Sequence, residues 1–139
     1  PPTKFQQALA NKRKVLGEEH PDLSYSYEGV GQALLGQGNA AAAIAPLRKA
    51  LSYEDSEPEA LAITGFVLAR ALWEEGKERD KARAEARQAL ERYVKLEKAD
   101  QVSEINAWLK AHQEDPPAPK KARSKKARGS KRKPRGVGM

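Results

Sequence analysis

Three copies of the dipeptide Ala-Leu in this chain are separated by similar intervals. They occupy residues 8–9, 50–51 and 89–90, so the intervals between these copies are 42 and 39 residues. Self-similarity with a period of about 20–50 residues is typical of stacked repeats, in which each supersecondary unit covers the apolar face of its neighbour. The repetition therefore predicts a linear array of similar units.

The residues between these dipeptides indicate helices. Ala, Leu, Glu, Lys, Gln and Arg dominate residues 4–112, and no stretch alternates with period two for long enough to predict a strand. Glycines, prolines and capping residues divide this part into helices with short connections, which makes neighbouring helices antiparallel. We expect helices over residues 4–16, 23–35, 40–53, 57–75, 80–98 and 101–112.

Two of these helices begin with capping signals. Asn39 stands directly before the expected helix over 40–53, and Asn is among the preferred N-cap residues. Ser56 and Glu59 have the spacing of a capping box, with Pro58 in the tolerated first turn. We therefore predict that the Ser56 side chain caps the helix over 57–75.

The apolar and small residues of these helices follow a known pattern. In the first copy they are Tyr27, Val30, Gly31, Leu34, Ala43, Ile44, Leu47, Ala50 and Leu51. In the second copy they are Leu68, Ala69, Leu72, Ala82, Ala86, Ala89 and Leu90. This pattern resembles the tetratricopeptide repeat, with Gly31 at the small position where the two helices touch, and the His20-Pro21-Asp22 link is similar to that of long repeats of the kinesin light chain type.

The resemblance implies an all-α superhelix of the tetratricopeptide-repeat type, with about six antiparallel helices. Residues 1–22 correspond to the second helix of a truncated preceding repeat plus its link, residues 23–98 to two repeats, and residues 99–115 to a C-terminal capping helix. Because the chain opens on Pro1 and not Met, we expect it to be cut from a longer chain. The helix over 4–16 would then lack a partner, so we expect Phe5, Leu9 and Val15 to be partly exposed and this end to self-associate.

Charge separates the last segment from the rest. Residues 1–115 contain 16 basic and 19 acidic residues, whereas residues 116–139 contain ten basic and no acidic residues. Residues 116–139 also contain few apolar residues, and burying these cannot offset the entropy lost when the segment is ordered. We therefore predict a disordered polybasic tail over 116–139. It resembles the tails of DNA-compacting proteins, and a nucleic acid or other polyanion would be bound by Lys120, Lys121, Arg123, Lys125, Lys126, Arg128, Lys131, Arg132, Lys133 and Arg135.

In tetratricopeptide-repeat arrays the first helix of each repeat lines a concave groove. The family's groove positions correspond here to Tyr25, Glu28, Gln32, Leu35, Ile63, Phe66, Arg70 and Trp73. The resemblance implies that a protein or peptide partner lies there in extended or helical form. Glu28, Gly29 and Gln32 depart from the family's carboxylate clamp, so acidic C-termini should not bind in that way. Phe66 and Trp73 have an alternative role, packing between helices.

Catalysis is not expected of this chain. It has no Cys and two well-separated His residues, so we expect no cofactor and no metal site. No apolar run is long enough for a membrane span, and residues 1–15 lack the apolar core of a signal peptide, which favours a cytoplasmic location. The leading hypothesis is a protein–protein adaptor whose tail adds electrostatic attachment.

Two other functions remain open. The segment Phe66-Val67-Leu68-Ala69-Arg70-Ala71-Leu72-Trp73, followed by Ala107-Trp108-Leu109, resembles the C-terminal repeat region of bacterial, myxobacterial-type Ser/Thr protein kinases. That resemblance implies a non-catalytic regulatory end, since no kinase motif occurs here. Alternatively, the chain is a non-specific DNA- or RNA-binding protein that acts through its tail.

Overall fold

The computed structural model describes residues 4–17, 20, 22–53, 55–114 and 116, and its regular elements there are all helices. They are α1 (Lys4–Leu16), α2 (Leu23–Gly36), α3 (Ala40–Leu51), α4 (Pro58–Glu75), α5 (Arg79–Lys95) and α6 (Ala99–Ala111). The expected all-α fold is confirmed. The tail that we predicted to be disordered lies, apart from Pro116, outside the described residues.

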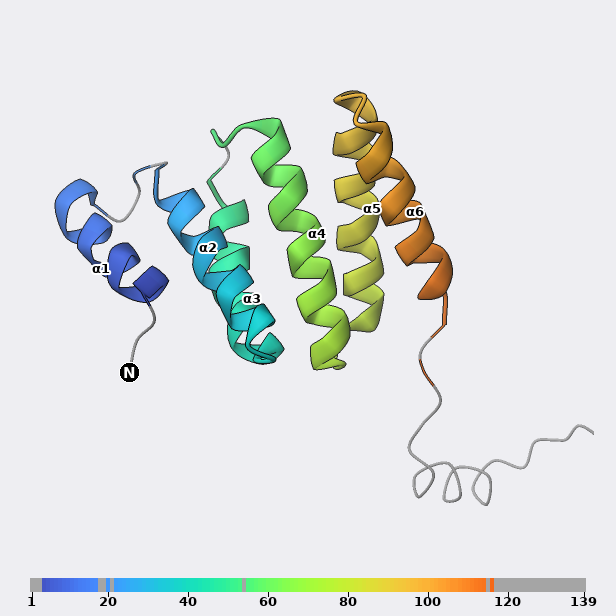
Figure 1. The fold of residues 1–139 in the computed structure, drawn as a ribbon, viewed down its shortest axis with the longest axis horizontal. Coiled ribbons are helices and arrows are strands. Elements are labelled where there is room, and N and C mark those ends of the chain that lie inside the picture. Colours follow the sequence, from blue (N-terminus) through green and yellow to red (C-terminus); the bar gives the residue numbers. More distant parts are fainter. Residues whose placement is uncertain (1–3, 18–19, 21, 54, 115, 117–139) are drawn as a thin grey trace, which may run out of the picture.

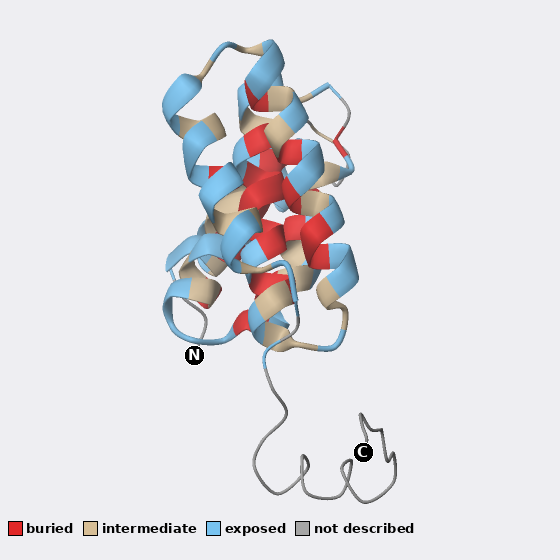
Figure 2. Ribbon diagram, turned by 90° about the vertical axis from the view of Figure 1, so that its right-hand side faces the viewer, coloured by how far each residue is buried: buried red, intermediate tan, exposed pale blue. Residues whose placement is uncertain are grey.

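The helices form a single row in which each packs on the next (Figure 1). α2 pairs with α3 and α4 with α5, and each pair is an antiparallel hairpin. Within the row, α2, α4 and α6 lie in front and α3 and α5 behind in the view of Figure 1. α2 also contacts α4 directly, so the first helices of the two hairpins are neighbours. Figure 2 shows that the buried residues run down the middle, between the two layers.

The closest helix approach in the first hairpin occurs at Gly31. A Cβ atom at this position would overlap with the side chain of Leu47 on α3, which is itself fully buried. Ala43 and Ala50 are also buried at this seam. Small residues here let two helix axes come together, and the large residues around them then lose their contact with water.

The second hairpin repeats this arrangement with alanine. Ala69 on α4 and Ala82, Ala86 and Ala89 on α5 are all fully buried. α6 then covers the outer side of the hairpin, with Ile105 fully buried against it. Fully burying a residue such as Ile105 contributes about 1.5–3 kcal/mol. Packing of α6 therefore closes the C-terminal end of the row.

The start of α4 differs from the prediction. Asn39 caps α3 as expected, because its side chain accepts a hydrogen bond from the Ala42 amide at 3.4 Å. The Ser56 capping box is wrong, since Glu57 is the N-cap residue of α4 and no side chain caps the helix. Pro58 disfavours helical geometry in the preceding residue. Glu57 is accordingly extended, with φ −63° and ψ 146°, and the helix begins one residue later than the capping box requires.

The exposure of α1 agrees only in part with the expectation. Phe5 and Val15 are exposed, at 53% and 81% of their surface. Leu9 is buried, because it reaches the core cluster shared by α2 and α3, so its predicted exposure is wrong. α1 is thus attached to the row through a narrow apolar contact.

The Gly31 contact yields a stability prediction. Gly31→Ala should lower the free energy of unfolding by about 1–3 kcal/mol, since the new methyl group forces Leu47 or the α3 backbone to move. Urea unfolding followed by circular dichroism measures this change. Gly36→Ala is the matched control, because nothing lies within 4 Å of a Cβ at Gly36, and it should leave stability unchanged or slightly raised. Equal effects of the two substitutions would contradict the close approach.

Candidate functional site: the surface between α2 and α4

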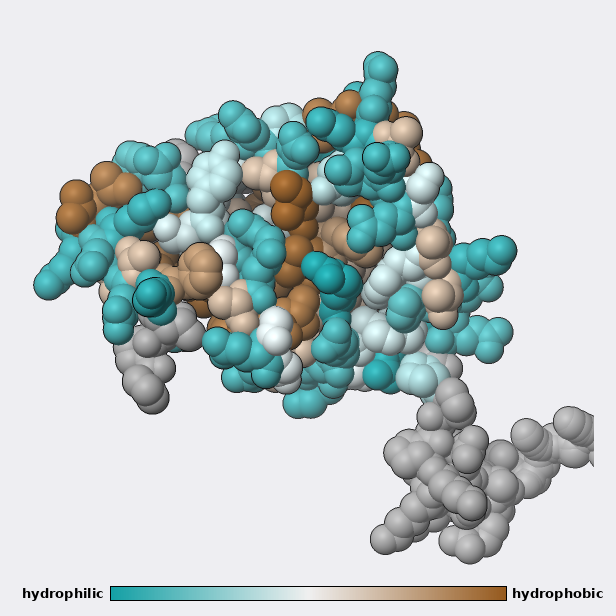
Figure 3. Space-filling view, in the orientation of Figure 1, coloured by the Kyte–Doolittle hydropathy of each residue, from teal (hydrophilic) through white to brown (hydrophobic). Residues whose placement is uncertain are grey.

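Two hollows lie between α2 and α4 on the front face of the row. The upper pocket, of about 130 Å³, is lined by Ser24, Tyr25, Glu28, Ala50, Ser56, Ala60, Leu61, Ile63 and Thr64. The lower hollow, of about 310 Å³, is lined by Gln32, Leu35, Gly36, Val67, Arg70 and Glu74. Figure 3 shows an apolar strip along α4 in this region, flanked by hydrophilic surface. An extended chain could therefore contact both hollows along one line.

Six of the eight predicted groove residues line these hollows. Tyr25, Glu28 and Ile63 belong to the upper pocket, and Gln32, Leu35 and Arg70 to the lower hollow. They come together because the repeat places residues of the same helical face at the same side of α2 and α4. Tyr25 and Ile63 are exposed, at 51% and 38% of their surface, so both offer apolar contact area.

The remaining two predicted residues face α6. Phe66 is buried, and its ring meets that of Trp108 edge to face at 5.8 Å between centroids. Trp73 also contacts Trp108 edge to face at 5.8 Å, and the ring of His112 at 4.7 Å. The geometry therefore gives Phe66 and Trp73 the alternative role considered above, packing between helices.

Two arginines fix the position of Trp73 from the side of α5. The guanidinium groups of Arg79 and Arg83 lie 4.9 Å and 5.1 Å from the Trp73 ring centroid. Arg83 is buried, donates a hydrogen bond to the carbonyl oxygen of His112 at 2.7 Å, and forms an ion pair with Asp80 at 2.8 Å. These contacts attach the end of α6 to α5, and they keep Trp73 directed toward the cap.

Glu28 is the carboxylate of the upper pocket. Its side chain is half-buried, and it accepts a hydrogen bond from the amide of Gln32 one turn further along α2. Burial raises the pKa of the Glu28 carboxyl above its ordinary value of 4.5. No basic side chain within the described part of the chain forms an ion pair with Glu28. Among the side chains that the structure describes, none therefore pairs with this carboxylate as a cation.

Sequence reasoning missed the hydroxyl groups of the upper pocket. Ser24 and Thr64 are buried in its walls, and Ser56 lies in the connection before α4. For Ser24 and Thr64, the spacing along the helix could have indicated a position in the pocket. Ser24 lies one turn before Glu28 on α2, and Thr64 one turn after Ala60 on α4, so each shares a face with another lining residue.

Comparison with known proteins identifies the repeat. Residues 3–53, which include α1, α2 and α3, match the tetratricopeptide repeat family. The first three helices of this chain thus carry tetratricopeptide-repeat sequence. Compared with curated proteins, the sequence gives no significant match. Tetratricopeptide repeats are protein–protein interaction scaffolds, and their helical fold is typically non-catalytic.

The described residues add two further observations about this repeat protein. They contain no group of three or more His, Asp or Glu side chains arranged to hold a metal ion. No helix that the structure describes is long and apolar enough to cross a lipid bilayer.

The environment of Glu28 leads to a pH prediction. Because its pKa is raised on folding, the folded chain binds a proton on Glu28 at higher pH than the unfolded chain does. Its contribution to stability is therefore most favourable below pH 4.5 and falls as the pH rises through the raised pKa. Glu28→Gln should make the protein more stable than the parent at pH 7, with the difference vanishing at acidic pH.

Urea unfolding between pH 4 and pH 8 checks this prediction. Glu91→Gln, on an exposed residue of α5, is the matched control and should leave the pH dependence of the parent in place. A Glu28→Gln variant that loses stability at neutral pH would show that the ionised carboxylate is favoured in the folded state.

Proposed function

We propose that this protein binds a peptide segment of a partner protein along the surface between α2 and α4, as a non-catalytic adaptor. The supporting observation is that six of the residues predicted from the repeat pattern line two hollows in one row on this surface. Tyr25 and Ile63 provide exposed apolar contacts, and Arg70 provides a cation at the other end. Aromatic and Arg side chains are enriched among the residues that contribute most to binding.

The charges of the two hollows differ along the surface. Glu28 lies in the upper pocket, whereas Arg70 lies in the lower hollow with its guanidinium 5.4 Å from the Phe66 ring centroid. A peptide with a basic group at the upper end complements Glu28, whereas the lower hollow presents charges of both signs, on Arg70 and Glu74. Complementary charges of this kind give specificity and a faster association rate more than they give affinity.

A peptide library displayed on phage, selected with the 139-residue chain, tests the groove. Tyr25→Ala, Ile63→Ala and Arg70→Ala should each weaken binding of the selected peptides about tenfold or more, which corresponds to about 1.4 kcal/mol. Val94→Ala is the control, because Val94 is an exposed apolar residue on α5, away from this surface. Unchanged binding by all three groove variants, with their helical circular dichroism intact, would reject the proposal.

The tail supports a second attachment, to a nucleic acid or other polyanion. Residues 116–139 contain ten basic and no acidic residues, and each phosphate contact releases counterions. No aromatic residue accompanies these charges, so base stacking and sequence readout are not expected.

Binding of duplex DNA across salt concentrations tests the tail. Replacing Lys120, Lys121, Lys125, Lys126, Lys131 and Lys133 by Gln should weaken binding and reduce the salt slope by about 5, since a slope of about 0.9 accompanies each lost contact. The same six positions replaced by Arg are the control and should retain the parent slope. Equal binding by the Gln and Arg variants would exclude the tail as the attachment.

A further inference from the structure

The upper pocket has one apolar side and one polar side. Ala50, Ala60, Leu61 and Ile63 supply the apolar lining, and their side chains come from α3 and α4. The polar lining consists of four hydroxyl groups and a carboxylate, on Ser24, Tyr25, Ser56, Thr64 and Glu28. A pocket of about 130 Å³ has room for a single side chain.

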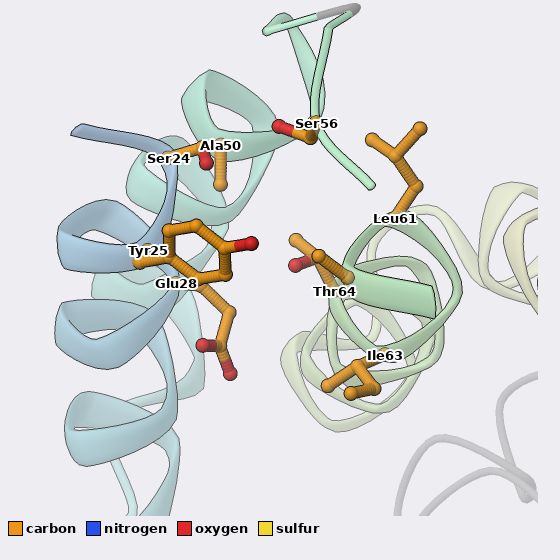
Figure 4. Close-up of a pocket in the computed structure, with 9 residues that line it drawn as sticks. Ser24, Tyr25, Glu28, Ala50, Ser56, Leu61, Ile63 and Thr64 are labelled. Atoms are coloured by element: carbon orange, nitrogen blue, oxygen red, sulfur yellow. The ribbon is translucent and has the colours of Figure 1, made fainter. Parts of the chain in front are cut away.

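The hydroxyl groups lie in the upper part of the pocket, and the Glu28 carboxylate lies below them. Figure 4 shows the hydroxyls of Tyr25 and Thr64 directed toward one another from α2 and α4, with the Glu28 carboxylate below Tyr25. The oxygens of Ser24 and Ser56 lie at the upper part of the same space. Every one of these oxygens is able to accept a hydrogen bond.

Two of the polar groups lack a complete set of partners. The hydroxyl of Ser56 is buried without a hydrogen-bond partner, and such a group costs free energy until a partner is supplied. Glu28 is hydrogen-bonded to Gln32 and has no basic partner among the described side chains. Burial alone accounts for its raised pKa, so no nearby cation offsets the charge. A cationic donor would satisfy Glu28, whereas the Ser56 oxygen is itself buried.

We propose that the upper pocket binds a lysine side chain from the partner peptide, with the methylene stem between Tyr25 and Ile63 and the ammonium group at the Glu28 carboxylate. This inference rests on the proposed peptide groove. Lysine matches the lining because its stem packs on apolar surface while its compact ammonium group donates in several directions. Arginine matches less well, because its planar guanidinium binds a carboxylate through two oxygens and Gln32 already occupies one oxygen of Glu28.

Titration of the 139-residue chain with blocked pentapeptides tests the lysine pocket. The probes are Ala-Ala-Lys-Ala-Ala and its analogues with Nε-acetyl-lysine or arginine at the centre, followed by amide chemical shifts in nuclear magnetic resonance spectra. The lysine peptide should shift the amides of Ser24, Glu28 and Thr64 saturably. Acetylation should weaken binding about tenfold, because it removes the charge and keeps the length.

Two variants identify the contact. Glu28→Gln should abolish the difference between the lysine and acetyl-lysine peptides, whereas the control Glu91→Gln should preserve it. Tyr25→Phe, which removes one hydroxyl and keeps the ring, should weaken the lysine peptide alone. Equal affinity for lysine and acetyl-lysine in the parent, or an undiminished preference in Glu28→Gln, would overturn the proposal.

The outcomes separate this inference from the proposed function. Library peptides that lack lysine but still depend on Tyr25, Ile63 and Arg70 would support the groove and reject the lysine pocket. If peptide binding does not depend on the groove residues and the preference for lysine over acetyl-lysine is also absent, both proposals are rejected. Tighter binding of the lysine probe by the variant with six Gln residues in the tail would identify the tail lysines as competitors, and would support lysine recognition.

Discussion

The row of helices depends on how closely the two helices of each hairpin approach one another. Gly31 lets α2 lie directly against Leu47, and buried alanines on α4 and α5 do the same for the second hairpin. The large side chains of both layers meet in one core only when the two helices of a hairpin lie this close together. A hairpin held further apart would leave those side chains in contact with water and would also displace α2 relative to α4. The geometry of the binding surface therefore follows from the small residues at the seams.

Capping of the C-terminal end decides which aromatic residues are accessible. Phe66 and Trp73 occupy the face of α4 that α6 covers, and Trp108 contacts both rings. Arg83 attaches α5 to the end of α6 through the His112 carbonyl. As a result, the surface between α2 and α4 presents Tyr25 and Ile63 as its exposed apolar residues. Because α6 covers Phe66 and Trp73, fewer of the predicted groove residues lie on the surface between α2 and α4 than the repeat pattern predicts.

The polar character of the upper pocket follows from its position at the start of α4. The connection between α3 and α4 brings Ser56 over the pocket, and Pro58 sets the extended geometry of Glu57 that moves the helix start away from Ser56. The Ser56 hydroxyl is thereby free of a capping role and buried beside other hydroxyls.

The sequence by itself determined the number, type and approximate limits of the helices, since apolar periodicity and glycine stops are local signals. It also determined which residues lie on the front of α2 and α4, because the repeat pattern fixes helix faces. It did not predict the end of α5, where Glu97 adopts a positive φ of 58° without a glycine. Tertiary structure alone decided that α6 covers Phe66 and Trp73, and that Ser24, Ser56 and Thr64 share one pocket. These groups are far apart in sequence, and a helix face does not specify which neighbour will cover it.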